Sequence, residues 1–266
     1  MKIIAEIGWN FLGDLSLAKE MSTKALESGA TIAKFQYWNP DTLKSGAWDE
    51  DGRREIYKKA ALNREKIQEL INYCDSIGIN SLFSIFTLNE AKVLNDLGLL
   101  AVKIPSHEIA NYELIEFCAS NFSTIYLSTG ASSENEVIKS NKILSKSEAD
   151  FNLMHCVSSY PCNLENANLP RIDWLKSLHK HVGLSDHTQS TLVPALSVAL
   201  GVEVIEKHFT IDNNLEGRDN KFALNPSNFK EMVDNINNAV LAMEHHGNNF
   251  QDSEADTVKN YRGRWG

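Results

Sequence analysis

Eight short apolar runs, each followed by a segment with helical periodicity, divide this 266-residue chain from end to end. The segments that follow the runs repeat apolar residues at the three- and four-residue spacing of an amphipathic helix. The runs are residues 2–7, 31–36, 80–86, 100–104, 123–128, 151–156, 181–185 and 202–208. Two of the expected helices span 189–200 and 226–245.

Eight strand–helix units without a break in composition predict an α/β fold, a (β/α)8 TIM barrel, whose usual length is about 250 residues. We expect this single domain to occupy residues 1–246, and a doubly wound parallel sheet is the structural alternative. Residues 37–63 form the longest interruption between a strand and a helix, and such loops usually shape a site or an interface. Residues 247–266 are polar and aperiodic, so we expect an extension that packs along the barrel or on a partner.

The composition of the chain limits which binding partners and which cellular compartment are expected. A net charge of −9 argues against nucleic acid and anionic membranes as general partners. No apolar run approaches the ~20 residues that a membrane-spanning helix needs, and the N-terminus does not read as a signal peptide. The four cysteines show no Cys-x-x-Cys spacing, so we expect a reduced, cytoplasmic protein.

Charged residues stand inside the apolar runs, where a purely structural core would not place them. Glu6, Lys34, Lys103 and Glu206 each lie in a different run. Burying an unpaired charge is costly, so such groups either pair with one another or face a ligand. One interpretation is a Glu6–lysine pair in a barrel that binds nothing. The other, which the number of charges favours, is a barrel mouth that binds an anion carrying phosphate and carboxylate groups.

Hydroxyl side chains follow the ends of five predicted strands. Serine at a strand end is common and often caps the next helix, so each alone is a weak signal. Their recurrence at successive strand ends, together with two lysines, predicts a phosphate cradle. The candidates are Ser84, Ser106, Ser128, Ser158 with its neighbour Tyr160, and Ser185.

Two histidines end neighbouring predicted strands. His187 follows Asp186, and His208 closes the run that contains Glu206. A lone histidine at a strand end is more often a satisfied core residue, but two on adjacent strands favour a metal pair. Two imidazoles do not complete a coordination shell, so substrate and water must supply the rest, which suits a labile Mn²⁺ or Mg²⁺ better than a closed Zn²⁺ site.

Several motifs occur in an order and spacing that resemble one family. They are AEIGWNFLGD at 5–14, KFQ at 34–36, KIPS at 103–106, LSTG at 127–130, HCVSSYP at 155–161, GLSDHT at 183–188, EKHFT at 206–210, EGRD at 216–219 and LNP at 224–226. With these motifs the chain resembles the catalytic barrel of the sialic acid synthases, the phosphoenolpyruvate-dependent synthases of N-acetylneuraminic acid and related nonulosonic acids.

The resemblance implies a transferase reaction that forms a carbon–carbon bond. C3 of phosphoenolpyruvate adds to the aldehyde of an N-acyl hexosamine such as N-acetylmannosamine, water attacks C2, and phosphate leaves. It implies metal ligation by His187 and His208, and acidic roles at the sugar for Glu6 and Glu206, with Asp186 orienting a neighbouring group. The positions that it assigns to substrate binding are Lys34, Ser84, Lys103, Ser106, Ser128, Ser158, Tyr160 and Ser185.

The chain departs from the family pattern at three places. Phe11 replaces a histidine that usually follows the first strand, and Ser158 replaces an asparagine. The chain also ends where the family continues into a small antifreeze-like domain that crosses a dimer to reach the sugar. The alternatives are therefore the same condensation on a different aldose, a separately encoded antifreeze-like partner, or a non-catalytic barrel subunit. A homodimer is expected by resemblance alone.

Overall fold

The computed structural model describes residues 1–266 and shows a closed barrel of eight parallel strands in sequence order. The strands are β1 (Lys2–Gly8), β2 (Ile32–Gln36), β3 (Asn80–Ser84), β4 (Ala101–Ile104), β5 (Thr124–Ser128), β6 (Asp150–Cys156), β7 (Val182–Asp186) and β8 (Val204–His208). β8 closes the ring against β1, with Lys2 opposite Val204 and Glu6 opposite His208. The predicted TIM barrel and its eight strands are confirmed, and the doubly wound alternative is excluded.

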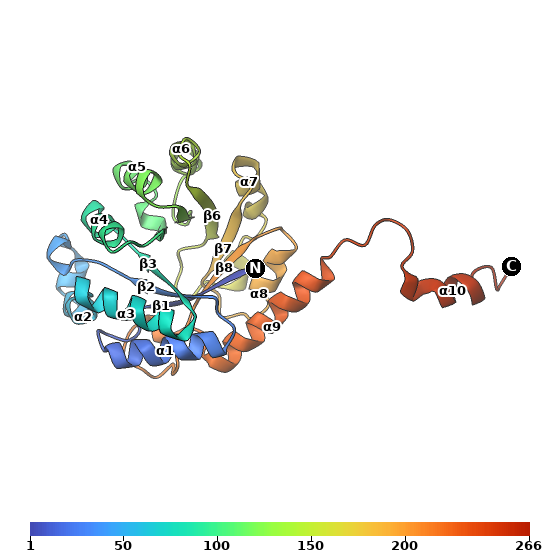
Figure 1. The fold of residues 1–266 in the computed structure, drawn as a ribbon, viewed down its shortest axis with the longest axis horizontal. Coiled ribbons are helices and arrows are strands. Elements are labelled where there is room, and N and C mark those ends of the chain that lie inside the picture. The colour runs from blue at the N-terminus through green and yellow to red at the C-terminus, as the bar shows by residue number, and fades with distance from the viewer.

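Helices surround the strands on the outside of the barrel, except for the last one, which stands apart (Figure 1). They are α1 (Leu15–Glu27), α2 (Arg53–Ala60), α3 (Arg64–Ile77), α4 (Leu88–Asp96), α5 (Tyr112–Asn121), α6 (Glu134–Leu144), α7 (Arg171–Leu178), α8 (Val193–Val198), α9 (Pro226–Ala242) and α10 (Ala255–Asn260). Short 3₁₀ turns lie at Pro40–Thr42, Ala47–Asp49, Ser106–Glu108, Leu164–Asn166, Asp219–Lys221 and Asp252–Glu254. No helix combines the length and the apolar character that crossing a bilayer requires.

The helix predicted at 189–200 is shorter in the structure, where α8 begins at Val193. The preceding backbone has other partners, because the Lys207 ammonium donates to the carbonyl of Ser190 at 3.1 Å and also to that of Thr188. Those carbonyls are thereby held in a loop rather than in the first turn of a helix. The loop predicted at 37–63 contains α2, which lies at the carboxyl ends of β1 and β2 and packs through Ala60.

The C-terminal residues extend away from the barrel in Figure 1, and α10 stands apart from the other helices. Almost all of residues 247–266 are exposed. The expectation that this extension packs along the barrel is therefore wrong for this structure, and its packing on a partner stays a prediction.

The main hydrophobic core lies between the strands and the helices. Phe35 on β2 packs its ring 5.5 Å from that of Phe83 on β3 and 6.0 Å from that of Phe11 after β1. All three side chains are at most 1% exposed. Burying a ring of this size stabilises the fold by roughly 1.5–3 kcal/mol, so this cluster fixes the first three strands around the site described below.

Gly183 on β7 marks the tightest point inside the barrel. A Cβ atom at this position would lie 2.3 Å from Met154 Sδ and 2.8 Å from the carbonyl oxygen of Val204. We predict that Gly183→Ala lowers the free energy of unfolding by about 1–3 kcal/mol, because an overpacked lumen must shift backbone as well as the methionine. Urea unfolding followed by circular dichroism measures the change. An unchanged free energy of unfolding would contradict a filled lumen at this level.

Candidate active site

Each strand carries one lumen residue low in the barrel and a second one two positions nearer its carboxyl end. Side chains alternate along a strand, so both members of each pair face the same side. The lower residues are Ile4, Ile32, Leu82, Ala101, Tyr126, Met154, Gly183 and Val204. Two positions later stand Glu6, Lys34, Ser84, Lys103, Ser128, Cys156, Ser185 and Glu206. Six of the lower residues form one buried apolar cluster, so the barrel is closed by an apolar layer beneath a polar one.

Two lysines and two glutamates form a network across this polar layer. The Lys34 ammonium lies 3.2 Å from Glu6 Oε2 and 3.1 Å from Glu206 Oε2. Glu206 Oε2 also accepts a hydrogen bond from Lys103 Nζ at 2.7 Å. These residues come from β1, β2, β4 and β8, so the contacts span the lumen. None of the four is more than 5% exposed, and their charges balance, which is what makes their burial tolerable.

Neutral side chains fix the orientation of the two carboxylates. Gln36 Nε2 donates to Glu6 Oε1 at 2.6 Å, and Ser185 Oγ donates to Glu206 Oε1 at 2.7 Å. Lys34 Nζ donates to Ser84 Oγ at 3.1 Å. Glu6, Glu206 and Lys34 are therefore each held by an ion pair and a further hydrogen bond, whereas Lys103 is held by its ion pair with Glu206 alone.

The two glutamates differ in how readily they hold a proton. Burial alone would raise the pKa of Glu206, but Lys103 and Lys34 hold that pKa far below its ordinary value. For Glu6, burial outweighs the effect of Lys34 and raises the pKa. Burial lowers the pKa of Lys103 despite Glu206, whereas Glu206 and Glu6 overcome burial and raise the pKa of Lys34. Glu206 is thus the ionised partner of the lysines, and Glu6 is the carboxyl group better suited to carry a proton.

Two serine hydroxyls meet at Gly130, just past β5, and Ser128 is the last residue of that strand. The Gly130 N–H donates to Ser106 Oγ at 3.0 Å. A Cβ atom at Gly130 would lie 2.9 Å from Ser106 Oγ and 2.5 Å from Ser158 Oγ, so the close approach of these groups needs glycine. Ser128 Oγ is buried without a hydrogen-bond partner. An unpaired buried hydroxyl is costly, and an oxygen of a bound ligand would satisfy it.

The predicted histidine pair lies at the end of β8 and just past β7, with ring centroids 5.4 Å apart. His187 Nδ1 donates to the Val157 carbonyl at 2.8 Å, which leaves Nε2 with its lone pair. Burial, together with His187 nearby, lowers the pKa of His208 well below its ordinary value, and its Nδ1 is buried without a hydrogen-bond partner. Burial would lower the pKa of His187, but Cys156 raises it above its ordinary value. Imidazoles in their deprotonated form, with free nitrogens, fit a metal ion. No cluster of three or more His, Cys, Asp or Glu side chains surrounds the pair, so protein groups alone do not complete a shell.

Asp186 is the one predicted site residue that does not face the lumen. Ser185 points inward, so the next residue of the strand points outward. Its carboxylate pairs with Lys207 Nζ at 2.5 Å and accepts hydrogen bonds from the N–H and hydroxyl of Thr188, each at 2.9 Å. This orientation contradicts a direct catalytic role. It agrees with the orienting role, because Asp186 fixes the backbone directly before and after His187.

Four residues of the mouth were not predicted as site residues. Asp219, within EGRD, has its Oδ2 3.8 Å from His208 Nδ1 and accepts a hydrogen bond from Trp9 Nε1 at 2.9 Å. Gln36, at the end of KFQ, holds Glu6. Cys156 Sγ lies 3.8 Å from His187 Nδ1; burial would raise its pKa, but His187 leads the groups that lower it to about 7. The signal for these three was their place in recognised motifs, whereas the fourth residue, Phe222, lies between two motifs.

Tyr160 covers the histidine pair, with its ring centroid 4.1 Å from that of His187 and 6.1 Å from that of His208. Phe222, between the EGRD and LNP motifs, lies 5.1 Å from His208 by the same measure. The structure therefore brings all predicted site residues to one end of the barrel, where Asp186 alone turns its side chain away from the lumen.

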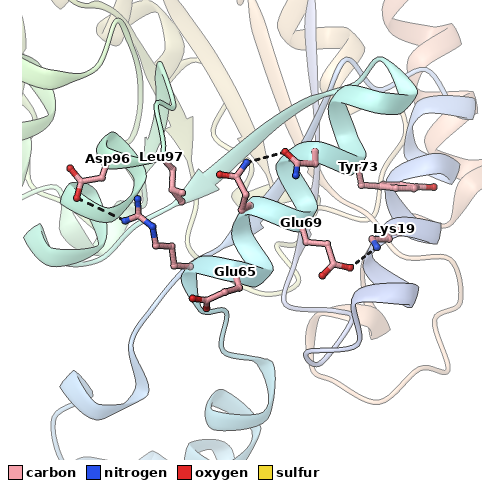
Figure 2. A pocket seen from close by; sticks show the side chains of 9 residues that line it. Lys19, Glu65, Glu69, Tyr73, Asp96 and Leu97 are labelled. Atoms are coloured by element: carbon pink, nitrogen blue, oxygen red, sulfur yellow. Dashed lines mark hydrogen bonds and ion pairs between the residues drawn. The ribbon is translucent and has the colours of Figure 1, made fainter.

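A separate groove lies on the outer flank of the barrel, between α1, α3 and the end of α4 (Figure 2). Four of its five charged groups are paired among themselves: Lys19 with Glu69 at 2.6 Å, and Arg64 with Asp96 at 3.9 Å. It contains neither the lumen network nor the histidines. The chemistry-bearing groups are thus at the barrel mouth and not in this groove.

Comparisons with known proteins agree with this geometry. The model of the NeuB family matches residues 21–248. The chain is 37% identical to the N,N'-diacetyllegionaminic acid synthase of Campylobacter jejuni, covering 91% of this chain and 77% of that protein. It is 32% identical to a pseudaminic acid synthase of the same species, covering 97% and 78%. The crystal structure of the sialic acid synthetase of Leptospira borgpetersenii superimposes with a TM-score of 0.89 at 32% identity, covering 96% of this chain and 89% of that one.

The lumen network predicts a large effect from one neutral substitution. Glu206→Gln removes the negative charge that pairs with Lys103 and Lys34, although its amide oxygen can still accept a hydrogen bond, so we expect the free energy of unfolding to fall by about 3–5 kcal/mol. Glu203→Gln, exposed at the opposite end of the barrel, is the control and should unfold like the wild type. Adding Lys103→Met to Glu206→Gln should restore part of the loss. Equal stability of Glu206→Gln and Glu203→Gln in urea would contradict the network.

Proposed function

The chain belongs to the NeuB family, as its motifs predicted, and we propose that it condenses phosphoenolpyruvate with the aldehyde of an N-acyl hexosamine to give a nonulosonic acid and phosphate. The observation that carries the proposal is the juxtaposition of two buried ammonium groups and an unpaired serine hydroxyl with a pair of histidines that each have a free ring nitrogen. The first group of residues suits a phosphorylated carboxylate. The second suits an electrophilic oxygen activated by a metal ion.

The proposed reaction balances without a further reactant. C3 of phosphoenolpyruvate forms a bond to the aldehyde carbon, and the aldehyde oxygen takes up a proton. Water adds to C2 and gives up its protons, and the bond between C2 and the bridging oxygen breaks. Phosphate leaves with that oxygen, and C2 becomes the keto carbon of the product.

Phosphoenolpyruvate would bind at the level of the lumen network. Lys34 and Lys103 supply positive charge, Ser106 and Ser158 supply hydroxyls around Gly130, and Ser128 supplies an unpaired one at the end of β5. The arriving anion competes with Glu206 for the same ammonium groups. Because the hydroxyls and lysines are already fixed by their neighbours, little conformational entropy remains to be lost on binding.

His187 and His208 would hold a divalent ion, for which Mn²⁺ or Mg²⁺ is the candidate. When bound, such an ion supplies Lewis-acid polarisation of the sugar aldehyde. The chain's own groups support this fit, since the Val157 carbonyl fixes the His187 ring and the low pKa keeps His208 unprotonated. Asp186 acts behind the strand by fixing the loop that carries His187.

The two glutamates would take different parts in proton transfer. Glu6, whose pKa is raised by burial, can hold a proton and pass it to the new hydroxyl group. Glu206 stays ionised between the lysines and positions them. This assignment follows the rule that a pair of carboxyl groups in different environments divides the acid and base roles.

The proposed reaction predicts phosphate release that depends on the acceptor. With Mn²⁺ and phosphoenolpyruvate, phosphate should appear only when a suitable aldose is present, because the C–O bond breaks after the new C–C bond forms. A phosphate assay over a panel of N-acyl hexosamines measures this. The proposal would be contradicted if phosphate were released at the same rate without sugar, or if no hexosamine caused phosphate release even at high concentration.

Removal of one histidine should separate metal binding from folding. We predict that His208→Ala weakens Mn²⁺ binding by more than about 100-fold, since even loss of a supporting partner costs 10–100-fold, and abolishes phosphate release. Electron paramagnetic resonance of free Mn²⁺ measures binding without reference to activity. His181→Ala, which removes a half-exposed histidine at the far end of the barrel, should leave both unchanged. Wild-type Mn²⁺ affinity in His208→Ala would refute the ligand assignment.

A further inference from the structure

Lys207 is a buried lysine on β8 that takes no part in the lumen network. It stands between Glu206, a member of that network, and His208, a member of the histidine pair. Side chains alternate along a strand, so Lys207 points to the opposite face, into the layer between the strands and the helices. Its neighbours on that face are Ile205 and Phe209, and all three side chains are at most 2% exposed.

The Lys207 ammonium has an acceptor for each of its three hydrogens. Nζ donates to Asp186 Oδ2 at 2.5 Å, to the carbonyl oxygen of Ser190 at 3.1 Å and to that of Thr188. A lysine ammonium has three donors and no acceptor, so these partners satisfy it. The cost of removing the charge from water is therefore offset by contacts that all belong to the segment around His187.

These contacts lie where the ladder between β7 and β8 ends. The last residue pair of that ladder is Asp186 and Lys207, so His187 lies beyond it. His208, in contrast, belongs to β8 and is still paired with β1, where it stands opposite Glu6. The sheet therefore places one histidine of the pair, and the contacts of the segment after β7 place the other.

Two sets of contacts hold the segment that carries His187. On the side of β6, the His187 ring donates to the Val157 carbonyl, and the Cys162 N–H donates to the His187 carbonyl at 2.9 Å. On the side of β8, Lys207 binds the two carbonyl groups that follow His187 in the loop. The first set orients the ring, and the second fixes the distance between this backbone and the strand that carries His208.

A purely structural role would not require a charge at this position. Apolar side chains of similar volume usually stabilise a protein interior as well as a buried ion pair does, or better. Ile205 and Phe209 show that this layer accepts apolar residues. An apolar side chain, however, cannot hold two backbone carbonyl groups beside the strand. The contacts of Lys207 therefore favour a positioning role.

We propose that Lys207 is the positioning residue that sets the separation of His187 and His208, and with it the affinity of the histidine pair for a divalent ion. No hydrogen bond or ion pair joins Lys207 to either imidazole, so its effect passes through the backbone. This inference rests on the proposed function, in which the two histidines hold the ion. Removal of a group that orients metal ligands typically weakens metal binding by about 10- to 100-fold.

Lys207→Met tests the inference, because methionine keeps much of the length of the side chain but has neither its charge nor its donors. We expect Mn²⁺ affinity to fall by at least about 10-fold, measured by electron paramagnetic resonance of free Mn²⁺. Phosphoenolpyruvate affinity, measured by calorimetry, should stay unchanged because its proposed site lies on the lumen face. In the metal-free protein, the amides of residues 187–192 should exchange hydrogen faster than in the wild type.

The double variant Lys207→Met/Asp186→Asn separates positioning from folding. Lys207→Met alone leaves a buried carboxylate without its counterion, so its urea midpoint should fall. The second substitution removes that charge and should restore much of the midpoint, while Mn²⁺ affinity stays at least about 10-fold below that of the wild type. Asp186→Asn alone keeps the ammonium on both carbonyl groups and should lose less Mn²⁺ affinity than the double variant. If Lys207→Met does not fold, this comparison replaces it.

Lys176→Met is the matched control. Lys176 Nζ donates to the Leu200 carbonyl at 3.0 Å, in the same connection between β7 and β8 but at the end away from the histidines. This variant also removes an ammonium group from a backbone carbonyl. It should keep the Mn²⁺ affinity and the hydrogen exchange of the wild type.

Three results would overturn the inference while leaving the proposed function intact. They are wild-type Mn²⁺ affinity in Lys207→Met or in the double variant, equal Mn²⁺ affinity of Asp186→Asn and the double variant, and a loss of phosphoenolpyruvate affinity as large as that of Mn²⁺ affinity, which would show a general distortion of the barrel. If the wild type bound no Mn²⁺, or if His208→Ala did not weaken binding, the metal site of the proposed function would fail, and the inference with it.

Discussion

The structure depends on the Glu206 carboxylate, which holds the ammonium groups of Lys34 and Lys103 inside the barrel at 3.1 and 2.7 Å. Without it two positive charges would stand in the lumen with Glu6 as the only counterion. A buried ion pair contributes little to stability compared with apolar residues of the same volume, but loss of one partner is severe. The barrel therefore keeps its charges in balance until an anion arrives to take the place of Glu206 at the lysines.

The layered lumen explains how one fold supports both stability and this charge network. Apolar residues such as Ile4, Tyr126 and Met154 fill the lower barrel and shield the network from solvent on that side. Side chains alternate between the two faces of a strand, so the residue two positions further along also faces the lumen, and there it is polar. The histidine pair and Tyr160 lie just beyond this polar layer. The packed rings of Trp9, Trp38, Tyr57 and Phe86 lie to one side of them. Charge, metal ligands and apolar surface thus occupy successive parts of one mouth.

Much of this was predictable from local pattern, because the strand period fixes which residues share a face. Glu6, Lys34 and Lys103 were predicted as site residues because burying a charge inside an apolar strand is costly unless the charge has a partner or a ligand. The orientation of Asp186 depends on one residue of strand register: the predicted strand stopped at 185, whereas β7 continues to Asp186 and turns its side chain outward, where it can orient the backbone around His187 but not reach the lumen. Asp219 lies in a loop without periodicity, and its position depends on Trp9, 210 residues away in the sequence. Trp9, Trp38, Tyr57 and Phe86 pack together from four separate segments of the chain, so no local sequence pattern predicts their contacts.

The central claim is that phosphoenolpyruvate binds where Glu206 now holds the two lysines. A crystal structure with phosphoenolpyruvate bound tests it most directly. The account predicts ligand oxygens within about 2.7–3.2 Å of the Lys34 and Lys103 ammonium groups, with Ser128 Oγ hydrogen-bonded to the ligand. Phosphoenolpyruvate bound away from the barrel mouth, with the lysine–glutamate network untouched and Ser128 still unpaired, would contradict it.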